Sequence, residues 1–428
     1  MTNRRDFFRF MATAGGLALV PPIFAQKGFS LMDTDTSILK LHSLVPHPVV
    51  IKSIDLLLFD NEYILSVTSA EGLKGFTLCN QRMPELVSLL RKAIVPHFIG
   101  KDARDIESLL EYVYVVNSNY KYTGLPFWNC VGHLEVAIFD LLGKVIQKPV
   151  HYFLGKKVRE YIDIYISSTT RETTPQQEAD NFVKRLSETG AKAVKFKVGG
   201  RMSKNADAMP GRSDTIVPTM RKALGDSITF YVDANGSYDT ENGLRMARYL
   251  EDQKVDIFEE PVPFDEYENT MLITKAIKTM KIAGGEQDTS LYRFGWLAKN
   301  KVLDVLQPDL YYNGGFIRCL QVAAMAAKAG IKFSPHSPKT NPLAAPMLHL
   351  MAVVQNSGGF QEWHINYPRH KSWYTPHYEI KEGKIAVPSG PGLGITFDLS
   401  IWDKAAAVAM MTAARTLRDI RVGEVIAQ

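Results

Sequence analysis

The sequence predicts an α/β protein built on a (β/α)8 barrel of the TIM type, preceded by an α+β domain. Short apolar runs rich in β-branched and aromatic residues alternate with helical patterns from about residue 160 onward. Each run closes on a polar residue, and from position 233 onward these residues recur about every 23 to 27 positions. A strand, a loop and a helix need roughly that much chain. Barrels of this kind carry their chemistry at the carboxyl ends of the strands, where these polar residues fall.

Residues 1–25 are predicted to be a twin-arginine export signal. Arg4 and Arg5 open a basic stretch, an apolar run follows at 11–20, and Ala25 offers a small residue for cleavage. The apolar run is too short to span a membrane. The alternative is a chance arginine pair in a cytoplasmic tail. The combination favours a periplasmic or otherwise exported mature protein that has no membrane span.

Residues 39–150 are predicted to form an α+β domain with its own core. Runs at 49–59, 63–69 and 73–78 indicate a three-stranded antiparallel meander. Helical patterns follow at 83–94, 106–116 and 127–146. The connection between the first two strands, residues 59–62, is short. The tail, residues 378–428, begins with strand and turn patterns, and we expect it to pack back on this domain.

The barrel is predicted to span residues 160–377 with eight strands. They are expected at 161–167, 193–198, 228–233, 255–259, 281–286, 302–309, 331–336 and 358–363. A polar insertion at 199–214 lengthens the second unit. Arg201 and Arg212 in this insertion either reach a substrate anion or belong to a solvated loop.

Composition sets limits on the class of partner. The chain has 428 residues, 46% hydrophobic and 22% charged, which is ordinary for a globular protein. The net charge of +5 is too mild to indicate a nucleic acid partner, and it is compatible with a small anionic substrate. Cys79, Cys130 and Cys319 are widely spaced, belong to no metal or redox motif, and are expected to be buried thiols.

Three acidic residues predict a metal site. Asp233, Glu259 and Glu286 end successive strands, so their carboxylates should converge and repel one another unless a cation neutralises them. Oxygen ligands favour Mg²⁺ over Zn²⁺, and Mn²⁺ would be a tolerated substitute. Side chains alternate along a strand, so Glu259 is the ligand and Glu260 points away. Asn235 and Glu260 are candidates to contact the metal ligands without binding the metal themselves.

Two lysines on one strand predict a base. Lys195 and Lys197 are two positions apart, so both side chains point into the mouth of the barrel. Two neighbouring ammonium groups raise each other's cost of charging, and a lysine with a lowered pKa can act as a base near neutral pH.

An Asp–His pair is predicted across the barrel. Asp309 and His336 end adjacent strands, and an aspartate that accepts from one ring nitrogen fixes the tautomer and raises the basicity of the other. Glu362 completes the ring on the last strand. It either hydrogen-bonds a substrate carboxylate or supports the other groups from behind.

These residues, in this order, resemble the enolase superfamily, and specifically its mandelate racemase branch. The resemblance runs from about residue 50 to about residue 392. Its motifs are KFK, VDAN, FEEP, AGGE, QPDLYYNGG and SPH on consecutive strands. The resemblance implies an N-terminal capping domain over an enolase-like barrel, with substrate specificity largely in the loops of the cap. It also implies assembly into a homo-oligomer. The short connection at 59–62 departs from the family, in which this loop is usually a lid.

The resemblance implies a role for each site residue. Asp233, Glu259 and Glu286 would bind Mg²⁺, and Lys197 would be the base on one face of the substrate, with Lys195 beside it. His336, paired with Asp309, would be the acid/base on the other face, and Glu362 would help to stabilise an enolate.

The shared step in this family removes a proton next to a carboxylate. If His336 then protonates a departing β-hydroxyl, the enzyme is a dehydratase of a sugar acid, which we expect first. If His336 returns a proton to the same carbon, it is a racemase or epimerase. Cycloisomerisation or another lyase reaction is a further alternative. An exported sugar-acid binding protein on a dead scaffold is the alternative from another class, disfavoured because all the acid, base and metal residues are present.

Overall fold

The computed structural model describes residues 38–366, 370–398, 400 and 406–412. The export signal predicted at residues 1–25 lies outside these ranges and stays a prediction. Within them, no helix combines the length and the apolar character needed to cross a membrane.

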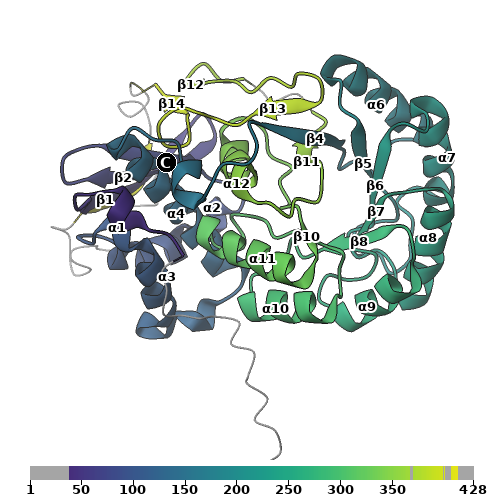
Figure 1. Ribbon diagram of the computed structural model, residues 1–428, viewed down its shortest axis with the longest axis horizontal. Coiled ribbons are helices and arrows are strands. Elements are labelled where there is room, and N and C mark those ends of the chain that lie inside the picture. The colour runs from purple at the N-terminus through teal and green to yellow at the C-terminus, as the bar shows by residue number, and fades with distance from the viewer. Residues whose placement is uncertain (1–37, 367–369, 399, 401–405, 413–428) are drawn as a thin grey trace, which may run out of the picture. The chain divides into compact units, whose positions relative to one another are not determined.

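The N-terminal domain is an antiparallel sheet packed against helices (Figure 1). Strands β1 (Ile51–Phe59), β2 (Glu62–Ser69) and β3 (Lys74–Leu78) form the meander, with β15 (Ala406–Thr412) added next to β1. The helices are α1 (Leu41–Leu44), α2 (Met83–Leu89), α3 (Ile106–Val115) and α4 (Leu125–Val145), with short turns η1 (Leu90–Ile94), η2 (Val95–His97), η3 (Ala103–Asp105) and η4 (Val116–Tyr122). Helix α4 is buried along most of its length, from Phe127 to Gly143.

The connection between β1 and β2 consists of Asp60 and Asn61 alone. Both have left-handed backbone angles, with φ of 52° and 60°. Short polar residues tolerate this conformation, and two in succession form a tight hairpin turn. The prediction of a short connection here is therefore confirmed.

The predicted barrel is confirmed, and all eight expected strands are present. They are β4 (Tyr161–Ser167), β5 (Ala193–Lys197), β6 (Thr229–Asp233), β7 (Ile257–Glu259), β8 (Lys281–Gly284), β9 (Val305–Leu306), β10 (Lys332–Phe333) and β11 (Gln361–His364). They pair in parallel in the order β10-β9-β8-β7-β6-β5-β4-β11. A parallel bridge between Phe333 and Ser357, just before β11, joins the two ends of this series.

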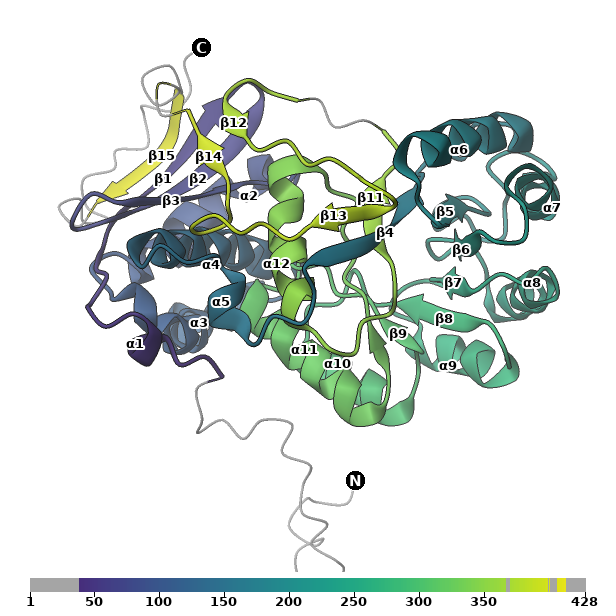
Figure 2. The same cartoon turned by 45° about the horizontal axis from the view of Figure 1, so that its top comes forward.

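One short helix, α5, precedes β4, and the other helices follow barrel strands and cover the outside of the sheet (Figures 1 and 2). They are α5 (His151–Leu154), α6 (Pro175–Thr189), α7 (Arg212–Leu224), α8 (Thr240–Asp252), α9 (Tyr267–Ala276), α10 (Leu291–Asn300), α11 (Phe316–Ala329), η5 (Asn341–Ala344) and α12 (Ala345–Val353). The sequence sets the ends of α6 locally. Thr174 and Gln177 form a capping box at its start, and Gly190 takes the left-handed conformation after its end.

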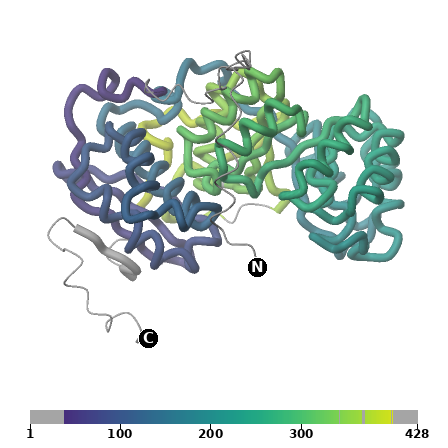
Figure 3. The backbone as a smooth tube through the Cα atoms, turned by 90° about the horizontal axis from the view of Figure 1, so that it is seen from below, coloured from purple at the N-terminus to yellow at the C-terminus, as the bar shows by residue number. Residues whose placement is uncertain are grey.

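The C-terminal segment contacts both parts of the protein. Strands β12 (Tyr374–Thr375) and β14 (Thr396–Phe397) pair with each other, and β15 joins β1 of the cap. Strand β13 (Lys384–Ala386) instead pairs antiparallel with β4 of the barrel, beside which it lies in Figure 2. The expectation that the whole tail packs on the cap therefore needs this correction. Figure 3 shows the yellow stretch between the blue cap and the green barrel helices.

Glycines allow the tail to approach α4 closely. Gly392 donates its N–H to Lys148 O at 2.9 Å and accepts from Val150 N at 2.8 Å. The next residue, Leu393, donates its N–H to Asp140 Oδ1 at 2.7 Å. A Cβ atom on Gly143 would lie 2.6 Å from Gly392 Cα, so this contact needs glycine.

Candidate active site

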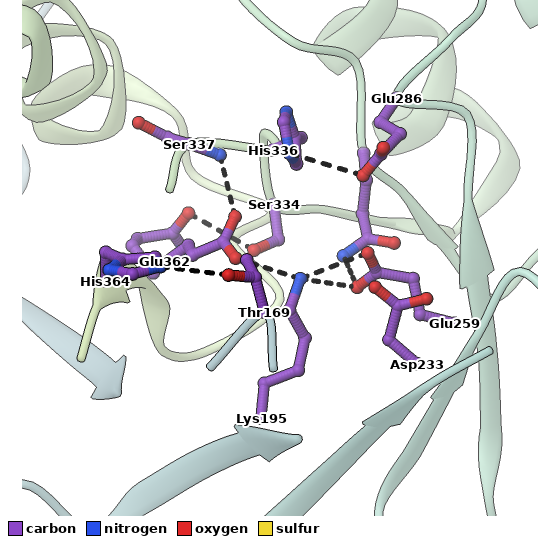
Figure 4. Close-up of polar contacts among 12 residues, drawn as sticks. Thr169, Lys195, Asp233, Glu259, Glu286, Ser334, His336, Ser337, Glu362 and His364 are labelled. Carbon is purple, nitrogen blue, oxygen red and sulfur yellow. Dashed lines mark hydrogen bonds and ion pairs between the residues drawn. The ribbon is translucent and has the colours of Figure 1, made fainter. Parts of the chain in front are cut away.

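The floor of the site is a small apolar layer inside the barrel. Its buried members are Tyr165, Ala193, Tyr231, Ile257, Ala283 and Val305. Side chains on one face of a strand recur every second residue, so Lys195, Asp233 and Glu259 lie one layer above this floor. The polar residues therefore lie above this apolar layer, and Figure 4 shows Lys195, Asp233 and Glu259 close together.

Lys195 bridges two acidic residues from different strands. Its Nζ lies 3.0 Å from both carboxylate oxygens of Glu259 and 3.0 Å from Glu362 Oε1. Burial alone would lower the pKa of Lys195, but Glu259 and Glu362 outweigh it and raise this pKa well above its usual value. The predicted lowering by a neighbouring ammonium is therefore wrong for Lys195, which is held as a cation.

Lys197 has a different environment from Lys195. Its Nζ contacts Asp233 Oδ2, and both side chains are buried. Asp233 is also held from its own strand end, since Asn235 donates its backbone N–H to Oδ1 at 2.7 Å and its side-chain amide to Oδ2 at 3.1 Å. Asn235 therefore supports Asp233, as predicted for a residue behind the ligands.

The three carboxylates expected to bind metal lie on neighbouring strands, but each is drawn to a cation or an imidazole of the protein. Asp233 contacts Lys197, Glu259 contacts Lys195, and His336 Nε2 lies 3.3 Å from Glu286 Oε2. Consequently, no three His, Cys, Asp or Glu side chains in the described part of the chain are already arranged as a metal site. The assignment of these ligands stays a prediction.

The donor set nevertheless fits a hard cation. Burial raises the pKa of Glu259, and the charges of Asp233 and Glu286 raise it further against the effect of Lys195. Burial together with the same neighbouring acids raises the pKa of Glu260 well above its usual value. Such mutual repulsion between buried carboxylates is relieved by a divalent ion with oxygen ligands.

Two buried oxygens strengthen this fit. Glu260 Oε1 and Gln307 Oε1 are buried without a hydrogen-bond partner, although buried polar atoms normally have one. The Gln307 amide donates to Glu259 Oε2 at 2.8 Å, so it lies against a predicted ligand. Gln307 was not predicted as a site residue. Its position two residues after Val305, which lies in the apolar layer inside the barrel, and two before Asp309 is the signal that could have identified it.

The predicted Asp–His pair is present on the opposite side of the site. His336 Nδ1 lies 2.9 Å from Asp309 Oδ2, and Asp309 Oδ1 accepts from Tyr311 N at 2.8 Å and Tyr312 N at 3.1 Å. Burial would lower the pKa of His336, but Glu286 and Asp309 outweigh it, so the pKa is raised. Lys339 also contacts Asp309 Oδ2 and opposes this rise. Sequence reasoning missed Lys339, which lies in the loop after the strand.

Glu362 contacts residues on both the Lys195 side and the His336 side of the site. It contacts Lys195 through Oε1 and accepts the backbone N–H of Ser337, the residue after His336, at 3.0 Å. Burial raises the pKa of Glu362, but Lys195 and His336 lower it to about 2, so the side chain is a carboxylate.

The two arginines of the 199–214 insertion, Arg201 and Arg212, have different environments. Arg212 is 1% exposed and donates to Lys197 O at 2.6 Å and to Thr173 O at 2.8 Å, so it supports the backbone under Lys197. Arg201 is exposed. A different arginine, Arg171, was missed by sequence reasoning, and its Nη2 donates to Asn235 Oδ1 at 2.6 Å.

The chain is similar to a known protein family and to several named proteins. A family model described as enolase C-terminal domain-like matches residues 178–401. Arabinonate dehydratase of Saccharolobus solfataricus is 25% identical over 321 residues, which cover 74% of this chain and 82% of that protein. L-talarate/galactarate dehydratase of Salmonella typhimurium is 26% identical over 341 residues, or 78% of this chain and 79% of that protein.

Solved structures share the fold. A Roseobacter denitrificans protein superposes with a TM-score of 0.79 at 29% identity, covering 85% of this chain and all (100%) of that one. A mandelate racemase/muconate lactonizing protein from Paracoccus denitrificans, solved in complex with magnesium, has a TM-score of 0.78 at 21% identity. That match covers 85% of this chain and 99% of that protein.

Proposed function

Because the chain belongs to the enolase superfamily, we propose that it removes the proton next to the carboxylate of a sugar acid and then eliminates water. The observation that carries this proposal is the placement of two proton-transfer groups around one acidic cluster. Lys197 contacts Asp233 at one side of the cluster, and His336 contacts Glu286 at the other.

Asp233, Glu259 and Glu286 would hold Mg²⁺, with Mn²⁺ as a substitute. When bound, the ion supplies positive charge that stabilises the negative charge developing on the substrate carboxylate. Asp233 and Glu259 would then be shared between the ion and the lysines that contact them in this structure.

The chain's own residues then have distinct tasks. Lys197 Nζ takes the α-proton as the C–H bond breaks and a carbon–carbon double bond forms. Lys195, a cation between Glu259 and Glu362, stabilises negative charge beside it. His336 Nε2 gives a proton to the β-hydroxyl as its C–O bond breaks, so water leaves and the enol product tautomerises to a 2-keto-3-deoxy acid. Asp309 orients the ring through Nδ1.

Racemisation or epimerisation is the second candidate, and the same observation favours it. With Lys197 and His336 at opposite sides, His336 could return a proton to the α-carbon instead of protonating a leaving group. The relatives support the first reaction, since arabinonate dehydratase and L-talarate/galactarate dehydratase are both named for it.

A screen separates these reactions. Protein lacking residues 1–25 would be incubated with Mg²⁺ and a library of mono- and diacid sugars in deuterated water. A new 2-keto-3-deoxy product establishes the dehydratase. Exchange of the α-proton without a new carbonyl identifies the racemase or epimerase. Binding with neither signal, and no effect of EDTA, would contradict catalysis and favour the dead scaffold.

We also propose export of the folded enzyme, which the Arg4–Arg5 pair and the following apolar run support. Replacing both arginines with lysine should retain the full-length chain in the cytoplasm. Unchanged export of that variant would contradict a twin-arginine signal.

A further inference from the structure

A cavity of about 590 Å³ opens beside the acid/base site, between the cap and the barrel. The cap contributes the β1–β2 turn and residues 80–82, and the barrel contributes His336 and the loop that follows it. Because His336 lines the cavity, the cavity adjoins the proton donor of the proposed function. Its volume is within the range of roughly 300–1,000 Å³ that is typical of ligand sites.

The cavity is larger than the tail of a six-carbon sugar acid requires. Water occupies about 30 Å³ per molecule, so 590 Å³ holds roughly twenty water-sized groups, whereas carbons 3 to 6 with their hydroxyls comprise only about eight heavy atoms. The surplus space is suited to a second sugar ring.

The charges on the walls are of both signs and largely paired. Lys371 lies 2.7 Å from Asp60 Oδ2 and 4.0 Å from Glu62 Oε1. Lys339 is paired with Asp309, while Arg82 is exposed at the rim. Two of the three cations in the wall, Lys371 and Lys339, already have carboxylate partners, so the wall offers mixed donors and acceptors, as hydroxyl groups require.

Aromatic surface completes the match to a sugar. Tyr312 lines the cavity and is partly exposed, whereas Tyr374, also in its wall, is buried. Aromatic rings offer an apolar face with a polar tip, which suits the mixed surface of a pyranose ring.

We infer that the preferred substrate is a monocarboxylic sugar acid carrying a neutral glycosyl group, with the second ring bound in the cavity between Asp60, Arg82 and Tyr312. This rests on the proposed function for the reacting end. Elimination across carbons 2 and 3 leaves a glycosidic bond at carbon 4 or beyond intact.

The test compares gluconate with its glycosylated forms, maltobionate, cellobionate and lactobionate, and with the diacid glucarate. At least one glycosylated acid should exceed gluconate in kcat/KM by about tenfold or more, as expected for a few additional hydrogen bonds. Preference for glucarate would indicate a second anion subsite, and equal or better turnover of gluconate would indicate an unused cavity. Either result overturns the inference.

A variant that fills the cavity gives a matched measurement. Gln81 is exposed and lines the cavity, so Gln81→Trp should reduce kcat/KM for the glycosylated acid about tenfold more than kcat/KM for gluconate. Gln176→Trp, on the exposed face of α6, is the control. Equal losses for both substrates in Gln81→Trp would overturn the inference.

Calorimetric binding to the Mg²⁺-loaded protein separates this inference from the proposed function. Binding of a glycosylated acid that Gln81→Trp abolishes, without exchange or product, supports the cavity assignment and contradicts the reaction. Dehydration of gluconate without binding of any glycosylated acid supports the reaction and overturns the cavity assignment.

Discussion

Glu135 Oε1 lies 3.1 Å from the backbone nitrogen of Ile317, so a side chain of the cap accepts a hydrogen bond from the first turn of a barrel helix. The other oxygen of the same carboxyl group accepts from Phe316 N. Glu135 therefore satisfies two N–H groups at this end of α11 that have no partner within the helix. Glu135 therefore joins the two parts of the protein at a fully buried position.

Replacing Glu135 with alanine should lower the free energy of unfolding by about 1–3 kcal/mol for each buried N–H left without an acceptor. Chemical denaturation followed by circular dichroism measures this loss. Glu111→Ala, on the exposed face of α3, is the control, and similar losses in the two variants would contradict a specific anchoring role.

The same carboxyl should make stability depend on pH. Burial raises the pKa of Glu135 from 4.5 to about 8, against the two backbone N–H donors. The folded state therefore binds more protons than the unfolded state between these values, and stability falls as pH rises through this window. The melting temperature of wild type should decrease between pH 5 and pH 8.5 relative to that of Glu135→Gln. A constant difference would contradict the raised pKa.

Removing either proton-transfer group should abolish turnover. Lys197→Ala and His336→Asn are each expected to lower kcat by about 10² to 10⁴-fold or more, since general acid–base groups contribute that much. In deuterated water one of the two variants can still exchange the α-proton if the reaction is a dehydration. Full activity of both variants would exclude the mechanism, and unchanged melting temperatures would show that both are folded.

Metal removal tests the acidic cluster directly. EDTA should remove all turnover and Mg²⁺ should restore it, with Mn²⁺ as a partial substitute, because the carboxylates otherwise pair with Lys195 and Lys197. Asp233→Asn should weaken reactivation by Mg²⁺ by at least tenfold, since metal ligands must be deprotonated oxygens. Full turnover in EDTA would contradict the metal site.

Close packing of the tail on α4 should be sensitive to a single methyl group. The Cβ of Gly143→Ala would lie 2.6 Å from Gly392 Cα, and overpacking of this kind costs about 1–3 kcal/mol. In Gly243→Ala, also within a helix, the nearest atom is the flexible end of Ile273, at 3.0 Å, so that variant should be nearly neutral. Thermal unfolding measures both, and equal effects would contradict docking of the tail at Gly392.

The barrel and most of the site could be predicted because strand periodicity fixes side-chain direction. Lys195 and Lys197 point the same way since they are two apart on β5, and Asp233 and Glu259 close neighbouring strands at one level. For such residues, the hydrophobic pattern and the spacing suffice to predict which way the side chain points.

Residues on loops could not be predicted in this way. Lys339 follows the end of β10 by six residues, where no period sets the direction of a side chain, and Arg171 lies in the loop after β4. The pairing of β13 with β4 was missed because three residues are too few to show a period. The predicted direction of the Lys195 pKa shift was wrong because the sequence shows the neighbouring lysine but not the two carboxylates that surround Lys195.

The two-residue turn at Asp60 and Asn61 also sets how the site meets the solvent. Its tip is tied down, since Lys371 and Trp373 both donate to Asp60 Oδ2, at 2.7 Å and 3.0 Å. So short a connection has no free segment that could swing across the opening. A segment that closes over the substrate would therefore have to come from another part of the protein than this turn.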